Sequence, residues 1–149
     1  MKQAAERAMA AGVKIVQAGV ESVGTIVPLF DAYLQFYKLP SNEEAARRFL
    51  HARLLKSEAV IYLALEEGAA GARKALGFTL LYPTWSSLSM KPWWNLNDLY
   101  VVPEARQRGV ARALMQRARR LAEETGASGL GLETAKDNFA AQKLYEQHG

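Results

Sequence analysis

The chain has no cysteine, only two histidines, His51 and His148, and no hydrophobic run longer than Ala59–Leu65. The missing cysteines exclude disulfide scaffolds, thiolate metal sites and cysteine nucleophiles. Two histidines argue against a zinc–histidine cluster, so we expect no metal. The hydrophobic run is far shorter than the ~20 residues of a membrane span, and the polar amino terminus lacks the apolar core of a signal peptide. We therefore expect a cytoplasmic protein with no membrane partner.

What the chain does have is a core-forming composition and a local excess of positive charge. Its 149 residues are 50% hydrophobic, which suits one packed domain, and no internal repeat or linker-like tract is present. The net charge is only +4, but six arginines lie between Arg106 and Arg120. Positive charge concentrated in this way favours a phosphate-bearing ligand over nucleic acid, so we expect no nucleic-acid partner.

Hydrophobic periodicity and turn residues predict an extension over residues 1–12, followed by one domain over residues 13–149. Strands are expected over Val13–Gln17, Ala59–Glu66, Lys74–Tyr82, Trp93–Val102 and Leu130–Thr134. Helices are expected over Leu29–Tyr37 with Pro28 in the first turn, from a Ser41 cap to Lys56, over Val110–Thr125 and over Phe139–His148. The segment Tyr82–Pro92, rich in Pro, Ser and Trp, is expected to be a loop. The strand–helix–strand unit over Trp93–Thr134 favours a parallel pair, and hence a mixed α/β sheet with helices on both faces.

The segment Asn97–Arg112, NDLYVVPEARQRGVAR, predicts a strand that turns through a glycine-containing loop into a helix. Backbone N–H groups at a helix start have no partner in the helix and lie at the positive end of its dipole. Gly109 and Ala111 leave that surface free of bulk, so a diphosphate can reach the main chain, and Arg108 and Arg112 add charge. The segment has neither the Gly-Lys-Ser/Thr of a Walker loop nor GxGxxG spacing. From the loop alone, a phosphate site and a plain helix start with solvated arginines are equally weighted alternatives.

The pattern Arg106-x-x-Gly109-x-Ala111 resembles the Gln/Arg-x-x-Gly-x-Gly/Ala motif of the GNAT superfamily of N-acetyltransferases. The segment LETAKDNFAAQKLYEQHG resembles the second motif of that family, with matching residues at Asn138, Ala141, Leu144, Tyr145 and Gly149. The resemblance implies a GNAT fold, an α/β structure whose mixed, mostly antiparallel sheet is flanked by helices. Members of the family continue past this glycine, so we expect a sheet that lacks the last two strands. A homodimer that covers the open strand edge, a truncated chain and a degenerate homologue are the alternatives that would explain this.

The resemblance also implies acetyl-CoA as the cosubstrate. The pyrophosphate would be held by the loop and helix start, which comprise Gln107, Arg108, Gly109, Val110, Ala111 and Arg112. The pantetheine arm would pair like an added strand with Leu99, Tyr100 and Val101, and would contact Asn138. A main-chain N–H in that stretch, here that of Leu99, would polarise the thioester carbonyl as an oxyanion hole does.

Direct transfer to an amine needs one group that takes a proton from the amine and one that protonates the departing thiolate. The resemblance assigns the second role, the general acid, to Tyr145, whose alternative is a ring that fills the core behind an amphipathic helix. Several relatives carry adjacent acids in the strand before the loop, but here Asn97 stands first, and asparagine cannot accept a proton. Asp98 and Glu133 are the remaining candidates for the base, each of them equally a structural hydrogen-bond acceptor, and solvent is the third route.

For the acceptor, the resemblance points to the first helix and to the segment before the long strand. Asp31, Tyr37 and Trp85 are the candidate substrate-binding residues, and Tyr33, Phe36, Tyr82, Trp93 and Trp94 are further aromatic candidates. A carboxylate beside aromatic rings suits a cationic amine, although aromatic residues at helical spacing are also typical of a core. We therefore expect an acetyl-CoA-dependent N-acetyltransferase that acts directly on a primary amine of a small molecule or amino acid. The alternative is a non-catalytic acyl-CoA-binding or assembly module of the same fold, which Asn97 and the missing strands favour.

Overall fold

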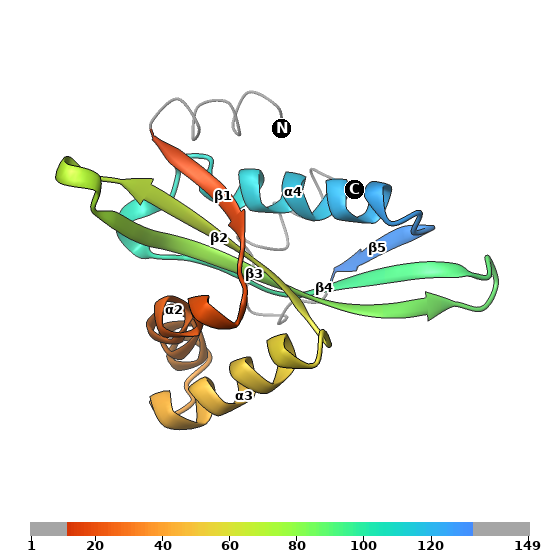
Figure 1. The fold of residues 1–149 in the computed structure, drawn as a ribbon, viewed down its shortest axis with the longest axis horizontal. Coiled ribbons are helices and arrows are strands. Elements are labelled where there is room, and N and C mark those ends of the chain that lie inside the picture. The colour runs from red at the N-terminus through yellow and green to blue at the C-terminus, as the bar shows by residue number, and fades with distance from the viewer. Residues whose placement is uncertain (1–11, 133–149) are drawn as a thin grey trace.

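The computed structural model describes residues 12–132, which form a five-stranded sheet with helices on both faces (Figure 1). The strands are β1 (Val13–Gln17), β2 (Val60–Glu67), β3 (Arg73–Ser86), β4 (Lys91–Val101) and β5 (Gly129–Leu132). The α-helices are α2 (Val23–Phe36), α3 (Glu43–Leu55) and α4 (Val110–Glu124). Short 3-10 turns lie at Val20–Ser22, Ala69–Gly71 and Pro103–Ala105.

The strands lie side by side in chain order, and the first four pair antiparallel with their neighbours. The chain reaches β5 through α4, and β5 pairs parallel with β4 over Trp93–Leu96. The crossover places α4 on one face of the sheet, while α2 and α3 cover the other face (Figure 1). The predicted mixed, mostly antiparallel sheet with helices on both faces is confirmed.

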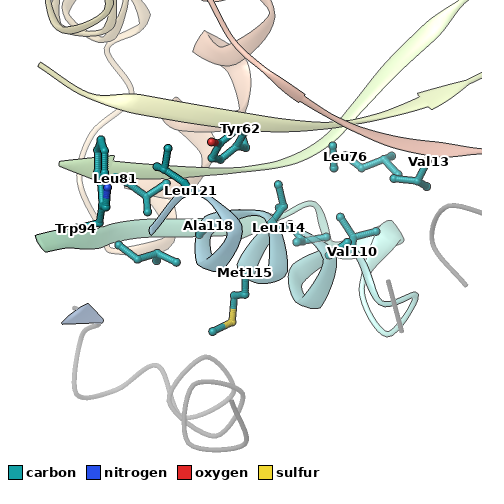
Figure 2. Packing of buried hydrophobic residues seen from close by; sticks show 14 of the residues in the cluster. Val13, Tyr62, Leu76, Leu81, Trp94, Val110, Leu114, Met115, Ala118 and Leu121 are labelled. Carbon is teal, nitrogen blue, oxygen red and sulfur yellow. The ribbon is translucent and has the colours of Figure 1, made fainter. Parts of the chain in front are cut away.

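Two hydrophobic cores, one on each face of the sheet, hold the helices in place. On one face, α4 packs Val110, Leu114, Ala118 and Leu121 against Tyr62, Leu76, Leu81 and Trp94 of the sheet (Figure 2). On the other face, α2 and α3 bury Ile26, Phe30 and Leu50 against Ile61, Phe78 and Leu80. Burying a Val, Leu, Ile or Phe side chain stabilises a fold by about 1.5–3 kcal/mol, so both cores hold their helices on the sheet.

The helix α2 begins at Val23 and carries Pro28 in its interior, whereas the sequence predicts a start at Pro28. Proline lacks the N–H that would bond one turn back, so this position costs the helix a backbone hydrogen bond. Val23, Ile26 and Val27, which precede the proline, are all buried against the sheet. Their burial outweighs the lost bond, and this explains why the rule for proline misplaced the start.

The segment 82–92, which the sequence predicts as a loop, instead continues the β3–β4 hairpin, which projects beyond the helices in Figure 1. Pairing runs to Ser86 and Lys91, and the N–H of Met90 closes the turn by donating to the Ser86 carbonyl at 2.7 Å. Pro92 does not interrupt the pairing of β4 with β3. Its carbonyl points toward the β5 side, where it accepts from the Ser128 N–H at 2.9 Å. The N–H and C=O of one strand residue point to the same edge, so the N–H that proline lacks would also point away from β3. A proline breaks a strand only where its missing donor faces a partner, and the sequence does not reveal which edge that is.

A bulge at Asn97 changes the face on which β4 presents its side chains. Leu80 pairs with Asp98 and Leu81 with Leu96, so Asn97 has no partner on β3. Leu96 belongs to the core under α4, whereas Asp98 interacts with Tyr33 of α2 on the opposite face. Residues two apart in a regular strand share a face, so the extra residue is what turns Asp98 toward α2.

Candidate functional site

The start of α4 presents main-chain donors. The helix begins at Val110, and the first helical bond runs from the Ala113 N–H to the Gly109 carbonyl at 3.0 Å. The cap position is Gly109, which has a left-handed φ of 82° and makes no side-chain cap. The N–H groups of Val110 and Ala111 therefore have no acceptor within the helix, and they lie at the positive end of its dipole.

The loop before α4 is tied to the sheet on both sides. The Arg106 Nε donates to the Val101 carbonyl at 3.0 Å, and the Arg106 guanidinium lies 5.8 Å from the centre of the Tyr100 ring. Arg108 pairs with Glu66 on β2. These contacts hold the predicted phosphate-binding loop against the ends of β4 and β2, and so fix the direction in which the N–H groups of the helix start point.

The edge of β4 that faces away from β3 also carries main-chain groups. The Asp98 carbonyl accepts from the Thr79 hydroxyl of β3 at 2.8 Å, and the Val102 N–H donates to the Leu76 carbonyl at 2.8 Å. Because backbone groups alternate along a strand, Leu99 and Val101 direct theirs to the opposite edge. Within residues 12–132, β5 pairs with β4 only as far as Leu96, so no described strand occupies this edge beyond the bulge.

On the α2 side of the bulge, an acid is buried among phenols. Asp98 is 9% exposed, and its carboxylate accepts a hydrogen bond from the Asn97 Nδ2 at 3.0 Å. Burial raises the pKa of Tyr33 far above its usual range, and the charge of Asp98 and hydrogen bonding to Asp98 and Tyr37 raise it further. Tyr33 therefore stays protonated at any ordinary pH and acts as a donor.

The phenol cluster extends from α2 to β3. The rings of Tyr33 and Tyr37 meet edge to face with their centres 5.1 Å apart. Burial also raises the pKa of Tyr82 on β3, as does the charge of Asp98, whereas the positive charge of Arg53 opposes the shift. The arrangement concentrates one negative charge between aromatic rings, which is an environment suited to an ammonium group.

The structure brings together only some of the predicted acceptor residues. Tyr37 joins the cluster around Asp98. Asp31 is buried, and its carboxylate accepts from the Ser41 hydroxyl at 2.6 Å and the Asn42 N–H at 2.8 Å, so it joins α2 to the start of α3. The predicted Ser41 cap of α3 is wrong. The Ser41 hydroxyl bonds to Asp31, and Asn42 caps the helix by accepting from the Ala45 N–H at 3.1 Å.

Trp85 does not join the cluster around Asp98. It lies at the far end of the β3–β4 hairpin with 73% of its surface exposed. Tyr82 packs against the core under α2, and alternation along β3 places Trp85 on the opposite face of the sheet. Sequence reasoning grouped the two residues because it took the segment that joins them for a loop.

Three of the predicted site residues, Glu133, Asn138 and Tyr145, lie outside the described residues. Sequence reasoning missed Glu66 altogether, since nothing near it in the chain marks it as a partner of Arg108.

Over residues 12–132, the structure contains no cluster of three His, Cys, Asp or Glu side chains that could hold a metal ion. In the same range, no helix is long and apolar enough to span a bilayer.

Comparison with known proteins gives consistent matches. Residues 26–149 match the model of the acetyltransferase (GNAT) family. The chain is 44% identical over 135 residues to YhfO of Bacillus subtilis (strain 168), an uncharacterized N-acetyltransferase, covering 91% of this chain and 87% of that protein. It is 30% identical over 127 residues to a probable acetyltransferase of Haemophilus influenzae, covering 85% of this chain and 84% of that protein.

Solved structures agree with these matches. A crystal structure of a probable acetyltransferase has a TM-score of 0.83 and 47% identity, covering 91% of this chain and 88% of that chain. A ribosomal-protein-alanine N-acetyltransferase from Brucella melitensis biovar Abortus has a TM-score of 0.77 at 24% identity, covering 91% of this chain and 90% of that chain. At that identity the second likeness concerns the fold alone.

Proposed function

The chain belongs to the acetyltransferase (GNAT) family, and from that premise we propose that it transfers the acetyl group of acetyl-CoA directly to a primary amine of a small molecule or amino acid. The predictions of a GNAT fold and of an N-acetyltransferase are confirmed by the family match and by the relatives. The cosubstrate, the class of acceptor and the residue roles are the parts that we propose.

The acetyl-CoA side of the proposal rests on main-chain groups. The N–H groups of Val110 and Ala111 suit a pyrophosphate, because they have no acceptor within the helix and lie at the positive end of its dipole. The edge of β4 that no described strand occupies suits the pantetheine arm. Its amides can pair with Leu99 and with the N–H of Val101 as an added strand would, while the Val101 carbonyl already accepts from Arg106. The Leu99 N–H is then the donor proposed for the thioester carbonyl oxygen, on which negative charge develops in the transition state.

The amine side rests on the cluster around Asp98. In the reaction, the amine nitrogen forms a bond to the acetyl carbon, the bond from that carbon to sulfur breaks, and the amine loses a proton. Asp98 is the proposed acceptor of that proton, and Tyr33 and Tyr37 are the proposed neighbours that orient the amine beside it. Tyr145 is proposed to protonate the departing thiolate, as the resemblance implies. The observation that carries this assignment is the buried Asp98 carboxylate next to the open edge of β4.

An amine panel, assayed by release of free thiol from acetyl-CoA, tests the proposal. The panel includes diamines, amino acids, an aminoglycoside and an alanine peptide, since solved structures with the same fold include an aminoglycoside acetyltransferase and a ribosomal-protein-alanine N-acetyltransferase. We expect release with at least one small primary amine. Tyr145→Phe should lower kcat by about 100-fold and leave the Kd of CoA unchanged, because it removes the proton donor alone.

The same assay distinguishes the non-catalytic alternative. If CoA binds and no amine in the panel releases thiol, the chain is an acyl-CoA-binding module and the proposed activity is wrong. If neither CoA nor acetyl-CoA binds, the assignment of the α4 start to the pyrophosphate is wrong as well. Within residues 12–132, β5 is an edge strand of the sheet, which supports a proposed homodimer, and light scattering would contradict it by giving the mass of a single chain.

A further inference from the structure

The loop that precedes α4 reaches a strand remote from it in the sequence, because Arg108 forms an ion pair with Glu66 at the end of β2. We infer that Glu66 is a positioning residue for coenzyme binding, and that Arg108 anchors the loop through Glu66 instead of binding a phosphate. This inference rests on the proposed function, in which the start of α4 binds the pyrophosphate of CoA. It differs from the sequence interpretation, which assigned Arg108 to the phosphate.

Glu66 is held rigidly by the sheet. Its strand, β2, lies between β1 and β3, and Glu66 is paired with Val13 on one side and with Lys74 on the other. The side chains of Glu66 and Arg108 are 29% and 35% exposed, against 45% and 59% for the neighbouring pair Glu67 and Lys14. A less exposed ion pair is less screened by solvent, so the pair with Arg108 constrains the loop more than a surface pair would.

The backbone conformation of the loop explains why it needs an anchor. Gln107 has a left-handed φ of 64° and Gly109 one of 82°, so Arg108 stands between two left-handed residues. A residue with a side chain adopts this conformation at a cost, and it persists only where surrounding contacts enforce it. Arg106 fixes one side of Gln107 to the Val101 carbonyl, and Arg108 fixes the other side to Glu66.

The two assignments of Arg108 predict opposite effects for the same substitution. If Arg108 is an anchor, Glu66→Gln weakens the anchor, the helix start loses its fixed direction, and CoA binds more weakly. If Arg108 binds a phosphate, the Glu66 carboxylate competes with that phosphate for the guanidinium. Glu66→Gln would then release Arg108 and strengthen CoA binding.

The experiment measures, by calorimetry, the Kd of CoA and of dephospho-CoA for the unsubstituted protein and for three variants. The variants are Glu66→Gln, Arg108→Gln and the combination of the two. We expect each single variant to weaken CoA binding by about fivefold, which is what the loss of a partly exposed ion pair amounts to. The double variant should be no weaker than either single variant, because both remove the same contact. Glu67→Gln, which removes a neighbouring acid from the same strand, should leave the Kd unchanged.

Three further readouts separate positioning from a purely structural role and from direct binding. The KM for acetyl-CoA should rise in Glu66→Gln while kcat stays the same, and the apo melting temperature should match that of Glu67→Gln. In both single variants the ratio of the affinity for CoA to that for dephospho-CoA should be unchanged, since no contact to the 3′-phosphate is lost.

Tighter or unchanged CoA binding by Glu66→Gln would overturn the inference, as would an affinity ratio that falls toward one in Arg108→Gln. If the unsubstituted protein binds no CoA at all, the proposed function fails and takes this inference with it.

Discussion

The two sides of the candidate site are built in different ways. The proposed coenzyme side consists mainly of main-chain groups, namely the N–H groups at the start of α4 and the edge of β4 that no strand within residues 12–132 occupies beyond Leu96. The proposed amine side consists of side chains from three elements, Tyr33 of α2, Tyr82 of β3 and Asp98 of β4. A main-chain site depends on local backbone conformation, whereas a side-chain site depends on how distant elements pack.

This difference determines which substitutions matter on each side. A main-chain site tolerates most side chains and fails where a substitution disturbs an unusual backbone conformation, as at Gly109. A side-chain site fails when its one charged group is removed, as at Asp98. Three substitutions test the comparison.

Asp98→Asn should have the largest effect. The amide keeps the shape of the carboxylate but neither carries charge nor accepts a proton, so kcat/KM for the amine should fall by about 100-fold. The Kd of CoA should stay the same, because the coenzyme side is built from other groups. Steady-state kinetics and calorimetry measure the two quantities, with Glu44→Gln on the exposed face of α3 as the control for an acid-to-amide change. A parallel loss of CoA affinity would show that the two sides are not separate.

Gly109→Ala should have an intermediate effect, on the coenzyme side alone. Its φ of 82° is left-handed, a conformation that costs a residue with a Cβ roughly 1–2 kcal/mol, so CoA should bind about tenfold more weakly. Gly126→Ala is the matched control, because Gly126 at the other end of α4 has a φ of 69° and open space around an added Cβ. It should lower the melting temperature and leave the Kd of CoA unchanged. Equal CoA affinities in the two variants would contradict a main-chain site at Gly109.

Tyr33→Phe tests the smallest of the three effects, a change in how the free energy of unfolding depends on alkaline pH. Burial raises the folded-state pKa of Tyr33 above the unfolded value, which is near 10. The folded chain therefore keeps a proton that the unfolded chain loses, so this contribution is fully present below pH ~10 and is lost as the pH rises. Between pH 10 and 11, the free energy of unfolding should fall by about 1 kcal/mol more in the unsubstituted protein than in the variant. Urea unfolding at the two pH values measures these free energies. An equal fall in the free energy of unfolding in both proteins would contradict a buried, protonated Tyr33.

The elements that the sequence predicted well are those with strong local signals. The strand β1 has the predicted bounds, and α4 was expected over Val110–Thr125 and is found over Val110–Glu124. An amphipathic stripe and a glycine at each end define α4 without reference to the rest of the chain. The glycine-containing loop and helix start, on which the proposed coenzyme side rests, were predictable for the same reason, since their motif lies within one short segment. The errors at Pro28, at Ser41 and in the segment 82–92 occurred where packing or the direction of a strand edge decided the outcome.

The amino-acid sequence by itself determined the helix start, the glycines beside it and the family to which the chain belongs, because each is written in neighbouring residues. Only the tertiary structure decided that Asp98 faces α2, that Trp85 does not, and that Glu66 holds Arg108. The first two depend on the bulge at Asn97 and on the hairpin register. The contact between Glu66 and Arg108 joins residues 42 positions apart in the sequence. Strand register and contacts between distant residues are set by how the whole sheet packs, and no local pattern carries that information.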